Sequence, residues 1–459
     1  MKTAFFGTVF LLVTIAMGSP ARAAFAPPHH NGPRAHSLTI GTAYLPPSAY
    51  DKTFGSHNWA FAAKYLDVAL TGPRNASELH GAGLGTAMYL DVHQCSSKSG
   101  PGPNEYPAPD CGDWPASAFY TQDGYADRTL TVSYNNRIVQ RLGNPGSPEL
   151  QARARASIDG ALREGRFDLV QFDDATTPDE WWSIVCNGIG MFEPWGYDCA
   201  SAPGGKAHRP WSSRFSVESW KTGVSALAEK SPIPAVFNGL QGYAGDGKPA
   251  AIADVVAKTP NAWGAICDTC FYGLGAVPKN PAQWTGPLLE SRLNGSLRVV
   301  GAGKNVIVVN HEVTDPGARA RGLADVMLFY DADRVWRWDG ACGDHSHIPV
   351  CPEAALTFYK PYGSYPGSTA ALRDGNGNYV REFAECFENA RPLGPCAAVV
   401  NPDRSASHPR PALRNAYAHT LTIAGDGLCA CYGDSGSVAV NGPRMPENIP
   451  AAAGFVAFR

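Results

Sequence analysis

Two adjacent acids stand at the end of one apolar run of the chain. In FDLVQFDDA (167–175), Asp173 and Asp174 close a stretch with the composition of a buried strand. A buried carboxylate is costly unless it is paired, and like charges in contact repel. Two carboxyl groups flanking a bond can cleave a glycoside, one as acid and one as nucleophile or base. Since neighbouring strand residues face opposite sides, these two aspartates are not expected to form that pair themselves.

The second carboxyl group is therefore expected from another strand. Asp268 is the first choice, because it ends an apolar run (262–271) between two cysteines that could stiffen the turn. Glu312, in the run 304–313, is the second choice. The side chains predicted to line the substrate site are Tyr44, Asp91, His93, Asp174, Asn238, Asn310, Asp331 and Trp336.

Acids, amides and aromatic residues dominate these candidates, and lysine and arginine are scarce among them. A phosphate or carboxylate substrate would require cations, so this pattern favours an uncharged, hydroxyl-rich substrate such as a sugar. A single acid is more often a helix cap or an ion-pair partner, and a single tryptophan is more often a packing residue. The pattern that indicates a catalytic site is the recurrence of acids at the ends of several predicted strands.

Strand-like and helix-like segments alternate from about residue 38 to 340, which predicts a (β/α)8 TIM barrel. In this fold the chemistry lies on loops at the carboxyl ends of the strands. A doubly wound open sheet is the alternative, but the first strand lacks the glycine-rich loop expected there. Ser147, Pro148 and Glu149 are typical of a helix start, and 216–230 and 249–258 are further predicted helices. The predicted strands are 37–45, 64–72, 86–94, 167–175, 233–240, 262–271, 304–313 and 324–336.

The pattern changes after about residue 345, where short strand-like runs such as YVREF and AAVVNP are separated by turns. This predicts a small C-terminal antiparallel β domain. The resulting organisation is a signal peptide (1–23), a flexible leader (24–36), the barrel (37–345) and the β domain (346–459).

The bulk composition limits the partners. With 38 Lys and Arg against 41 Asp and Glu, the net charge of -3 leaves no basic stripe for nucleic acid. Lys2, an apolar stretch and SPARA (19–23) are typical of a signal peptide, so a secreted or periplasmic protein is expected; an uncleaved anchor is the alternative. No membrane association is expected after cleavage, and a monomer that needs no cofactor is predicted.

The 12 cysteines all follow the predicted cleavage site, which indicates disulfides. Zinc would need paired CxxC units, and only Cys267 and Cys270 have that spacing. The neighbouring pairs are Cys95/Cys111, Cys186/Cys199, Cys267/Cys270, Cys342/Cys351, Cys386/Cys396 and Cys429/Cys431.

With FDLVQFDDA on its fourth strand, the barrel resembles glycosyl hydrolases distantly similar to α-galactosidases and endo-α-1,4-polygalactosaminidases. The segment YVREFAECFENARPLGPCAAVVNP (379–402) resembles the entry of such barrels into their β domain. The resemblance implies a carbohydrate substrate, with Asp173 as nucleophile or base and Asp268 as acid. The chain departs from the family in its cysteine-bearing insertions at 95–111 and 386–396 and in the cysteines around Asp268.

Four alternatives remain open. The first is that the barrel has kept its fold without catalytic activity and is a non-catalytic carbohydrate-binding protein. Gly433 to Gly436 (GDSG) resembles the nucleophile segment of chymotrypsin-like serine proteases, but the histidine segment of that family is absent. DGNGN (374–378) has alternating oxygen ligands, yet it lacks the remaining features of a calcium loop, so a hairpin turn is favoured. His93 and His311, each near an acid, leave metal-dependent hydrolysis as a lower-ranked interpretation.

Overall fold

The computed structural model describes most of the chain after residue 54, and His36 to Thr39 before it. The predicted signal peptide and most of the predicted leader lie outside the described residues. The described ranges are 36–39, 55–63, 66–96, 111, 113–122, 125–129, 131–134, 138–177, 180, 192–193, 216–241, 247–268, 270–271, 285–311, 316–340, 352–388, 391–423 and 438–459.

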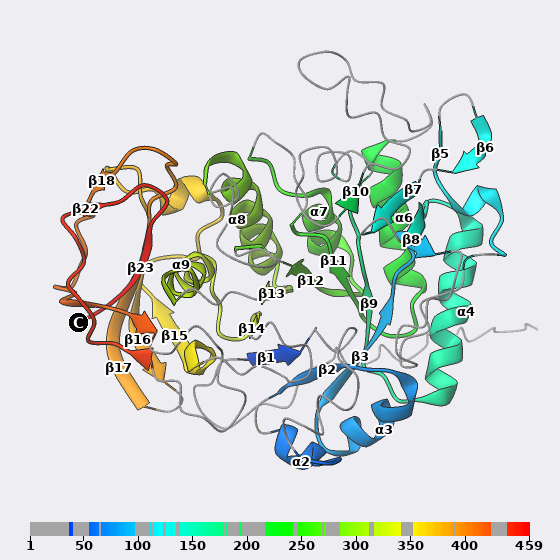
Figure 1. Cartoon of the computed structure of the whole chain (residues 1–459), viewed down its shortest axis with the longest axis horizontal. Helices are drawn as coiled ribbons and strands as arrows, with labels where there is room; N and C mark the ends of the chain where they lie inside the picture. The colour runs from blue at the N-terminus through cyan, green and yellow to red at the C-terminus, as the bar shows by residue number, and fades with distance from the viewer. Residues whose placement is uncertain are drawn as a thin grey trace, which may run out of the picture.

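The fold is mixed α/β, with a curled parallel sheet at its centre (Figure 1). Seven strands follow one another in the order β2-β3-β9-β11-β12-β13-β14. A short strand, β1 (His36–Thr39), pairs in parallel with both β14 and β2. The bounds are β2 Val68–Leu70, β3 Gly85–Leu90, β9 Leu169–Phe172, β11 Ala235–Asn238, β12 Ala262–Asp268, β13 Asn305–His311 and β14 Val335–Gly340.

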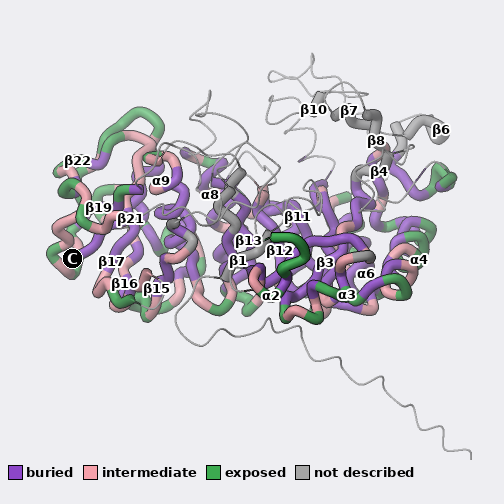
Figure 2. The backbone as a smooth tube through the Cα atoms, turned by 60° about the horizontal axis from the view of Figure 1, so that its bottom comes forward, coloured by how far each residue is buried: buried purple, intermediate pink, exposed green. Residues whose placement is uncertain are grey.

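The strands are apolar on both faces because both faces are covered, as is usual for parallel sheets. Leu70, Leu169, Val236, Ile266 and Ile307 belong to one buried cluster, which fills the concave face of the sheet. The opposite face packs under the helices, and Figure 2 shows the strands as a buried centre inside a more exposed shell. Burying each of these side chains contributes roughly 1.5–3 kcal/mol.

The predicted helix that starts at Ser147 and the predicted helices at 216–230 and 249–258 are confirmed. The first of them begins where expected, since the side chain of Ser147 accepts a hydrogen bond from the amide of Leu150 and Pro148 occupies the first turn. Its periodic apolar residues Leu150, Ala154 and Ile158 are buried. The helices are α2 Trp59–Ala62, α3 Pro73–Gly81, α4 Pro148–Glu164, α6 Val217–Lys230, α7 Ala251–Lys258, α8 Gly286–Gly301 and α9 Pro316–Met327.

The predicted strand at 324–336 is wrong. The last helix, α9, runs to Met327, and β14 begins only at Val335. The run ADVMLFY is apolar because it forms the buried end of α9 and the turn that follows, where Leu328, Phe329 and Tyr330 are all enclosed. A short apolar run does not by itself distinguish a buried helix end from a strand.

A separate antiparallel sheet follows, in the order β15-β16-β17-β23-β19, and it lies at one end of the molecule (Figure 1). The expected strands in YVREF and AAVVNP are confirmed as β16 and β17, and α9 packs against β17 and β23. The bounds are β15 Leu356–Pro361, β16 Tyr379–Glu388, β17 Arg391–Val400, β19 His419–Thr420 and β23 Gly454–Phe458.

Smaller pairings complete the described part of the chain. One four-stranded sheet, β10-β7-β8-β4, forms beside the central sheet, and three two-stranded pairs form elsewhere. The remaining bounds are β4 Gln94–Ser96, β5 Thr121–Gln122, β6 Tyr125–Thr129, β7 Thr131–Tyr134, β8 Ile138–Leu142, β10 Phe192–Glu193, β18 His408–Pro409, β20 Thr422–Ile423, β21 Val438–Ala439, β22 Asn448–Ile449, η2 Ala116–Ala118, η4 Pro352–Ala355 and η5 Thr369–Leu372.

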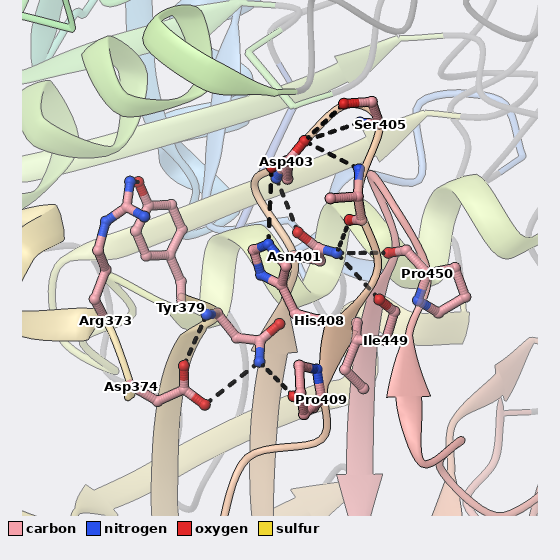
Figure 3. A network of polar contacts seen from close by, with 12 residues as sticks. Arg373, Asp374, Tyr379, Asn401, Asp403, Ser405, His408, Pro409, Ile449 and Pro450 are labelled. Carbon is pink, nitrogen blue, oxygen red and sulfur yellow. Dashed lines mark hydrogen bonds and ion pairs between the residues drawn. The ribbon is translucent and has the colours of Figure 1, made fainter. Parts of the chain in front are cut away.

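The DGNGN segment is a turn held by its own side chain. Asp374 accepts hydrogen bonds from the backbone amides of Asn376 and Asn378, at 3.0 and 2.8 Å. The side chain of Asn378 also donates to the carbonyl of Pro409. The side chain of Asn401 donates to the carbonyls of Ala406, Ile449 and Pro450, and Figure 3 shows it between Ile449 and Pro450. These contacts are those of a hairpin turn, as expected from the sequence.

Two of the predicted disulfides are confirmed, Cys267–Cys270 and Cys386–Cys396. Cys111 is also disulfide-bonded. The pairs Cys186/Cys199, Cys342/Cys351 and Cys429/Cys431 lie outside the described residues, and so does the GDSG segment. The central parallel sheet differs from the paired β-barrels that a chymotrypsin-like protease requires. Along the described chain, no helix is both long and apolar enough to cross a bilayer.

A buried ion pair joins α9 to the segment before β15. Arg319 and Glu353 are 8% and 2% exposed, and the Arg319 Nε lies 2.6 Å from the Glu353 Oε1 in a bidentate contact. Removing one partner leaves the other charge buried and unpaired. We therefore expect Glu353→Gln to lower the free energy of unfolding by about 3–5 kcal/mol, measured by urea denaturation.

The exposed pair Lys360–Glu385 provides the control, because its side chains are 70% and 41% exposed. Glu385→Gln is expected to change the free energy of unfolding by about 1 kcal/mol or less. Equal effects of the two substitutions would contradict the importance of the buried pair.

Candidate active site

The candidate site lies at the carboxyl edge of the central sheet. Strand residues alternate between faces, so Asp173 lies on the same face as Leu169, and Asp268 on the same face as Ile266. Leu169 and Ile266 belong to the cluster on the concave face. Asp173 follows β9 and Asp268 ends β12, with β11 between them. The two aspartates therefore point toward one region although they are 95 residues apart in sequence.

Asp173 is enclosed by hydrogen-bond donors. It is 6% exposed, and its Oδ1 accepts hydrogen bonds from the Asn238 Nδ2 at 2.6 Å and from the backbone amide of Asp174 at 3.0 Å. The side chain of Tyr89 donates a further hydrogen bond to it. These donors favour the ionised carboxylate.

Asn238 links the two acids. Its Nδ2 lies 2.6 Å from an oxygen of Asp173 and 3.5 Å from the Oδ2 of Asp268. Those two oxygens are therefore at most about 6 Å apart, a separation of the kind found between paired catalytic carboxyl groups. Asn238 is 4% exposed, and its Oδ1 has no hydrogen-bond partner in the described part of the protein.

Burial and neighbouring acids raise the pKa of two aspartates. For Asp173 burial is the main cause, the charge of Asp268 adds to it, and the three donors oppose it. The pKa of Asp174 is raised well above its usual value by burial and then by the charges of Asp173, Asp91 and Asp268. The cluster is therefore expected to retain protons at a higher pH than isolated aspartates do.

His93 supports the turn that carries these acids. Its Nδ1 lies 2.9 Å from the main-chain oxygen of Asp173, so this nitrogen carries the proton. Burial lowers the pKa of His93 to about 4, which makes the ring neutral at physiological pH. The ring also lies near Trp220 of α6, and Asp91 accepts a hydrogen bond from the His93 amide at 3.1 Å. Asp91 and His93, both predicted site residues, thus lie beside Asp173.

The backbone explains why two aspartates are adjacent. Asp174 has a φ of 52°, a left-handed conformation that side chains other than glycine, asparagine and aspartate rarely adopt. In this conformation its amide turns back toward the carboxylate of Asp173. Asp174 therefore stabilises the carboxylate of Asp173 through its main-chain amide, and it adds a further carboxyl group to the site.

A substitution series at Asp174 tests this role. Asparagine and glycine tolerate the left-handed conformation, whereas alanine is strained there. We expect Asp174→Ala to lower the free energy of unfolding by about 1–2 kcal/mol relative to Asp174→Asn and Asp174→Gly, measured by urea denaturation. If the alanine and asparagine variants were equally stable, the left-handed conformation at residue 174 would not depend on the type of side chain.

The structure does not place every predicted residue at this edge. Tyr44 and Glu312 lie outside the described residues, and for Asn310 the structure gives only a backbone position on β13. Asp331 precedes β14 and pairs with Arg334 at 3.1 Å, so it lies at the amino end of that strand, away from the site. This correction follows from the misplaced eighth strand.

Trp336 is a packing residue. It is fully buried beside Trp263, with the ring centroids 5.2 Å apart, and its Nε1 donates a hydrogen bond to Asn305. These residues lie near the amino ends of their strands, so the predicted contact of Trp336 with substrate is wrong. The indole of Trp336 fills space between the strands in the apolar interior, near their amino ends.

Sequence reasoning missed Tyr89. This tyrosine lies on β3, two residues before Asp91 and therefore on the same face, and its side chain hydrogen-bonds Asp173. The alternation that drew attention to Asp91 and His93 would have identified it. Among the described residues, no group of three or more histidines, cysteines, aspartates or glutamates has the arrangement needed to hold a metal ion.

Comparisons with known proteins give only distant similarities. No family model matches the sequence, and no curated protein matches it. The glycoside hydrolase domain of PelA from Pseudomonas aeruginosa matches with 11% identity and a TM-score of 0.32, over 61% of this chain and 90% of that one. The α-galactosidase from Lactobacillus brevis matches with 9% identity and a TM-score of 0.33, over 92% of this chain and 48% of that one.

Proposed function

We propose that the protein is a glycoside hydrolase that cleaves O-glycosidic bonds of a poly- or oligosaccharide with two carboxyl groups. Asp173 acts as nucleophile or base, and Asp268 acts as the acid. The observation that supports this most strongly is the position of Asn238, whose Nδ2 lies within 3.5 Å of both carboxyl groups. The fold that carries them is taken to be a closed barrel of eight strands, with β1 completing the ring.

We propose the covalent, retaining route, with which the separation of the two acids is compatible. Inverting enzymes hold their carboxyl groups about 6.5–9.5 Å apart to admit a water molecule, whereas retaining enzymes hold them about 5–5.5 Å apart. An upper limit of about 6 Å between two of the oxygens fits the second case. Asp173 would attack the anomeric carbon while Asp268 gives its proton to the departing oxygen, and water would then release the sugar with Asp268 as base.

The hydrogen bonds of Asp173 suit this assignment. Asn238 and the amide of Asp174 donate to the same oxygen, Oδ1, so they hold the carboxyl group in one orientation. The other oxygen is the one assigned to attack. The unpartnered Oδ1 of Asn238 is a buried acceptor beside the reacting groups, suited to a sugar hydroxyl. Asp91 and Asp174 are proposed to bind further hydroxyls.

The organisation predicted from the sequence belongs to the same proposal. The barrel would extend over 37–345 and the β domain over 346–459, after removal of the signal peptide at 1–23. Two disulfides are compatible with an oxidising compartment. We therefore propose a secreted or periplasmic monomer that requires no cofactor.

The experiment is a screen of the mature protein against a panel of polysaccharides, with reducing-end release as the readout. The expected result is release from at least one polysaccharide, with the anomeric configuration retained in the product when it is followed by proton NMR. Binding of a polysaccharide without release would support the alternative, a non-catalytic carbohydrate-binding barrel. Release with an inverted configuration would contradict the covalent route.

A further inference from the structure

The loop that follows Asp268 is closed by a disulfide. Asp268 is the last residue of β12, and the Cys267–Cys270 bridge spans it. Both cysteines are buried, at 0% and 1% exposed. The side chain of Asp268 therefore projects from a short ring that is anchored in the core on both sides.

A buried arginine donates a hydrogen bond to this disulfide-closed loop. Arg292 lies on α8, is 3% exposed, and donates from its Nη1 to the carbonyl oxygen of Cys270 at 2.6 Å. A buried guanidinium is costly unless it has hydrogen-bond acceptors and a compensating charge. The nearby carboxylate of Asp325 on α9 supplies that charge.

The same carboxylate connects to the C-terminal sheet. Asp325 is fully buried and accepts a hydrogen bond from the Nε of Arg321 at 3.0 Å. Arg321 in turn donates to the carbonyl oxygen of Ala452. Gly454 of β23 packs so closely on Arg321 that a Cβ there would lie 2.3 Å from the arginine Cδ. This close approach fixes the arginine against the sheet.

We propose that Arg292 and the Cys267–Cys270 disulfide position Asp268 for acid catalysis, and that Asp325 and Arg321 anchor this arrangement to the C-terminal sheet. The inference rests on the proposed function for its catalytic consequence. On this proposal the C-terminal sheet contributes to catalysis by anchoring the loop that carries Asp268, without touching the substrate. Arg292 is thus a positioning residue, since it donates a hydrogen bond to the carbonyl of Cys270 in the loop that carries Asp268.

The variants are Arg292→Met, Arg292→Lys and the double variant Cys267→Ala/Cys270→Ala. A catalytic group displaced by about 1 Å loses about 10²-fold in rate. We expect kcat to fall about 10- to 100-fold in Arg292→Met and in the cysteine double variant, with KM changed by about twofold or less. Arg292→Lys retains a donor and a charge, so it is expected to restore part of the lost kcat.

The matched control removes the other described disulfide. Cys386→Ala/Cys396→Ala opens a bridge between β16 and β17 of the C-terminal sheet, on strands that carry no predicted site residue. It is expected to lower the melting temperature and to leave kcat of the folded protein within about twofold of the wild-type value. A kcat loss equal to that of the Cys267/Cys270 variant would overturn the proposal.

A second measurement needs no substrate. Hydrogen exchange of the backbone amides of 262–268 reports how firmly the end of β12 is held. We expect faster exchange there in Arg292→Met and in the Cys267/Cys270 variant, and unchanged exchange there in the Cys386/Cys396 variant. Unchanged exchange in all variants would overturn the positioning role. Faster exchange in a protein that hydrolyses no polysaccharide would reject the proposed function and retain the structural part of the inference.

Discussion

Replacing Asp173 by asparagine is expected to lower kcat by about 10³- to 10⁵-fold, because the variant lacks the attacking oxygen. The change preserves the shape of the side chain, and the Oδ1 of the new amide can still accept from Asn238 and from the amide of residue 174. Folding should therefore be retained. The measurement is the initial rate of reducing-end release by the purified variant.

The pH profile of the wild-type protein checks the same assignment. Burial and the charge of Asp268 raise the pKa of Asp173. A nucleophile acts in its ionised form, so kcat/KM should fall on acidification as pH passes through this raised pKa, above the ordinary aspartate value of about 3.9. An acidic limb at the ordinary aspartate pKa, or full activity in Asp173→Asn, would refute the assignment.

Asp268→Ala carries the second-largest expected effect. Loss of the general acid is expected to lower kcat about 10²- to 10⁴-fold for a poor leaving group such as another sugar. The loss should be small for an aryl glycoside with a strongly acidic phenol, since that leaving group departs without a proton. The measurement compares the two substrate types in the wild-type protein and in the variant.

Glu312→Gln is the matched control for the acid, because Glu312 is the rival predicted from the sequence. It should retain kcat within about tenfold on both substrate types, since a residue that only binds substrate contributes less than the acid does. If Glu312→Gln showed the leaving-group dependence and Asp268→Ala did not, the roles of the two residues would be exchanged.

Period-two alternation explains how far the sequence could predict the site. Asp173, Asn238 and Asp268 end apolar strands on the side that faces the interior, and the structure brings them within hydrogen-bond reach through Asn238. Alternation also indicates Tyr89, which strand ends alone did not suggest. Where the composition of a strand makes its bounds clear, period-two alternation predicts which of its residues face the interior.

The errors occurred where an apolar run has more than one explanation. The segment before β14 is apolar because it forms the buried end of α9 and the turn that follows, so the sequence pattern places Asp331 and Trp336 at the wrong end of a strand. Their actual environments, an ion pair with Arg334 and a contact with Trp263, depend on tertiary packing. The left-handed conformation of Asp174 is likewise set by its surroundings, and the sequence indicates only that aspartate tolerates it.

The buried network behind Asp268 could not be predicted at all. Arg292 and Asp325 lie on different helices, and Arg321 reaches Ala452 across more than a hundred residues of chain. No local pattern marks such contacts, because each depends on how α8 and α9 pack against the two sheets. The cysteine spacing did predict the bridge that the network supports.

The central claim is that Asp173 and Asp268 act on one bond as a pair, and a double-variant cycle tests it most directly. The kcat values of Asp173→Asn, Asp268→Asn and the combined variant are compared on the polysaccharide that the screen identifies. Residues that act as a unit give strongly non-additive losses, so the combined variant should be within about tenfold of Asp173→Asn alone. A combined loss equal to the product of the two single losses would show that the two carboxyl groups act independently, and it would contradict the account.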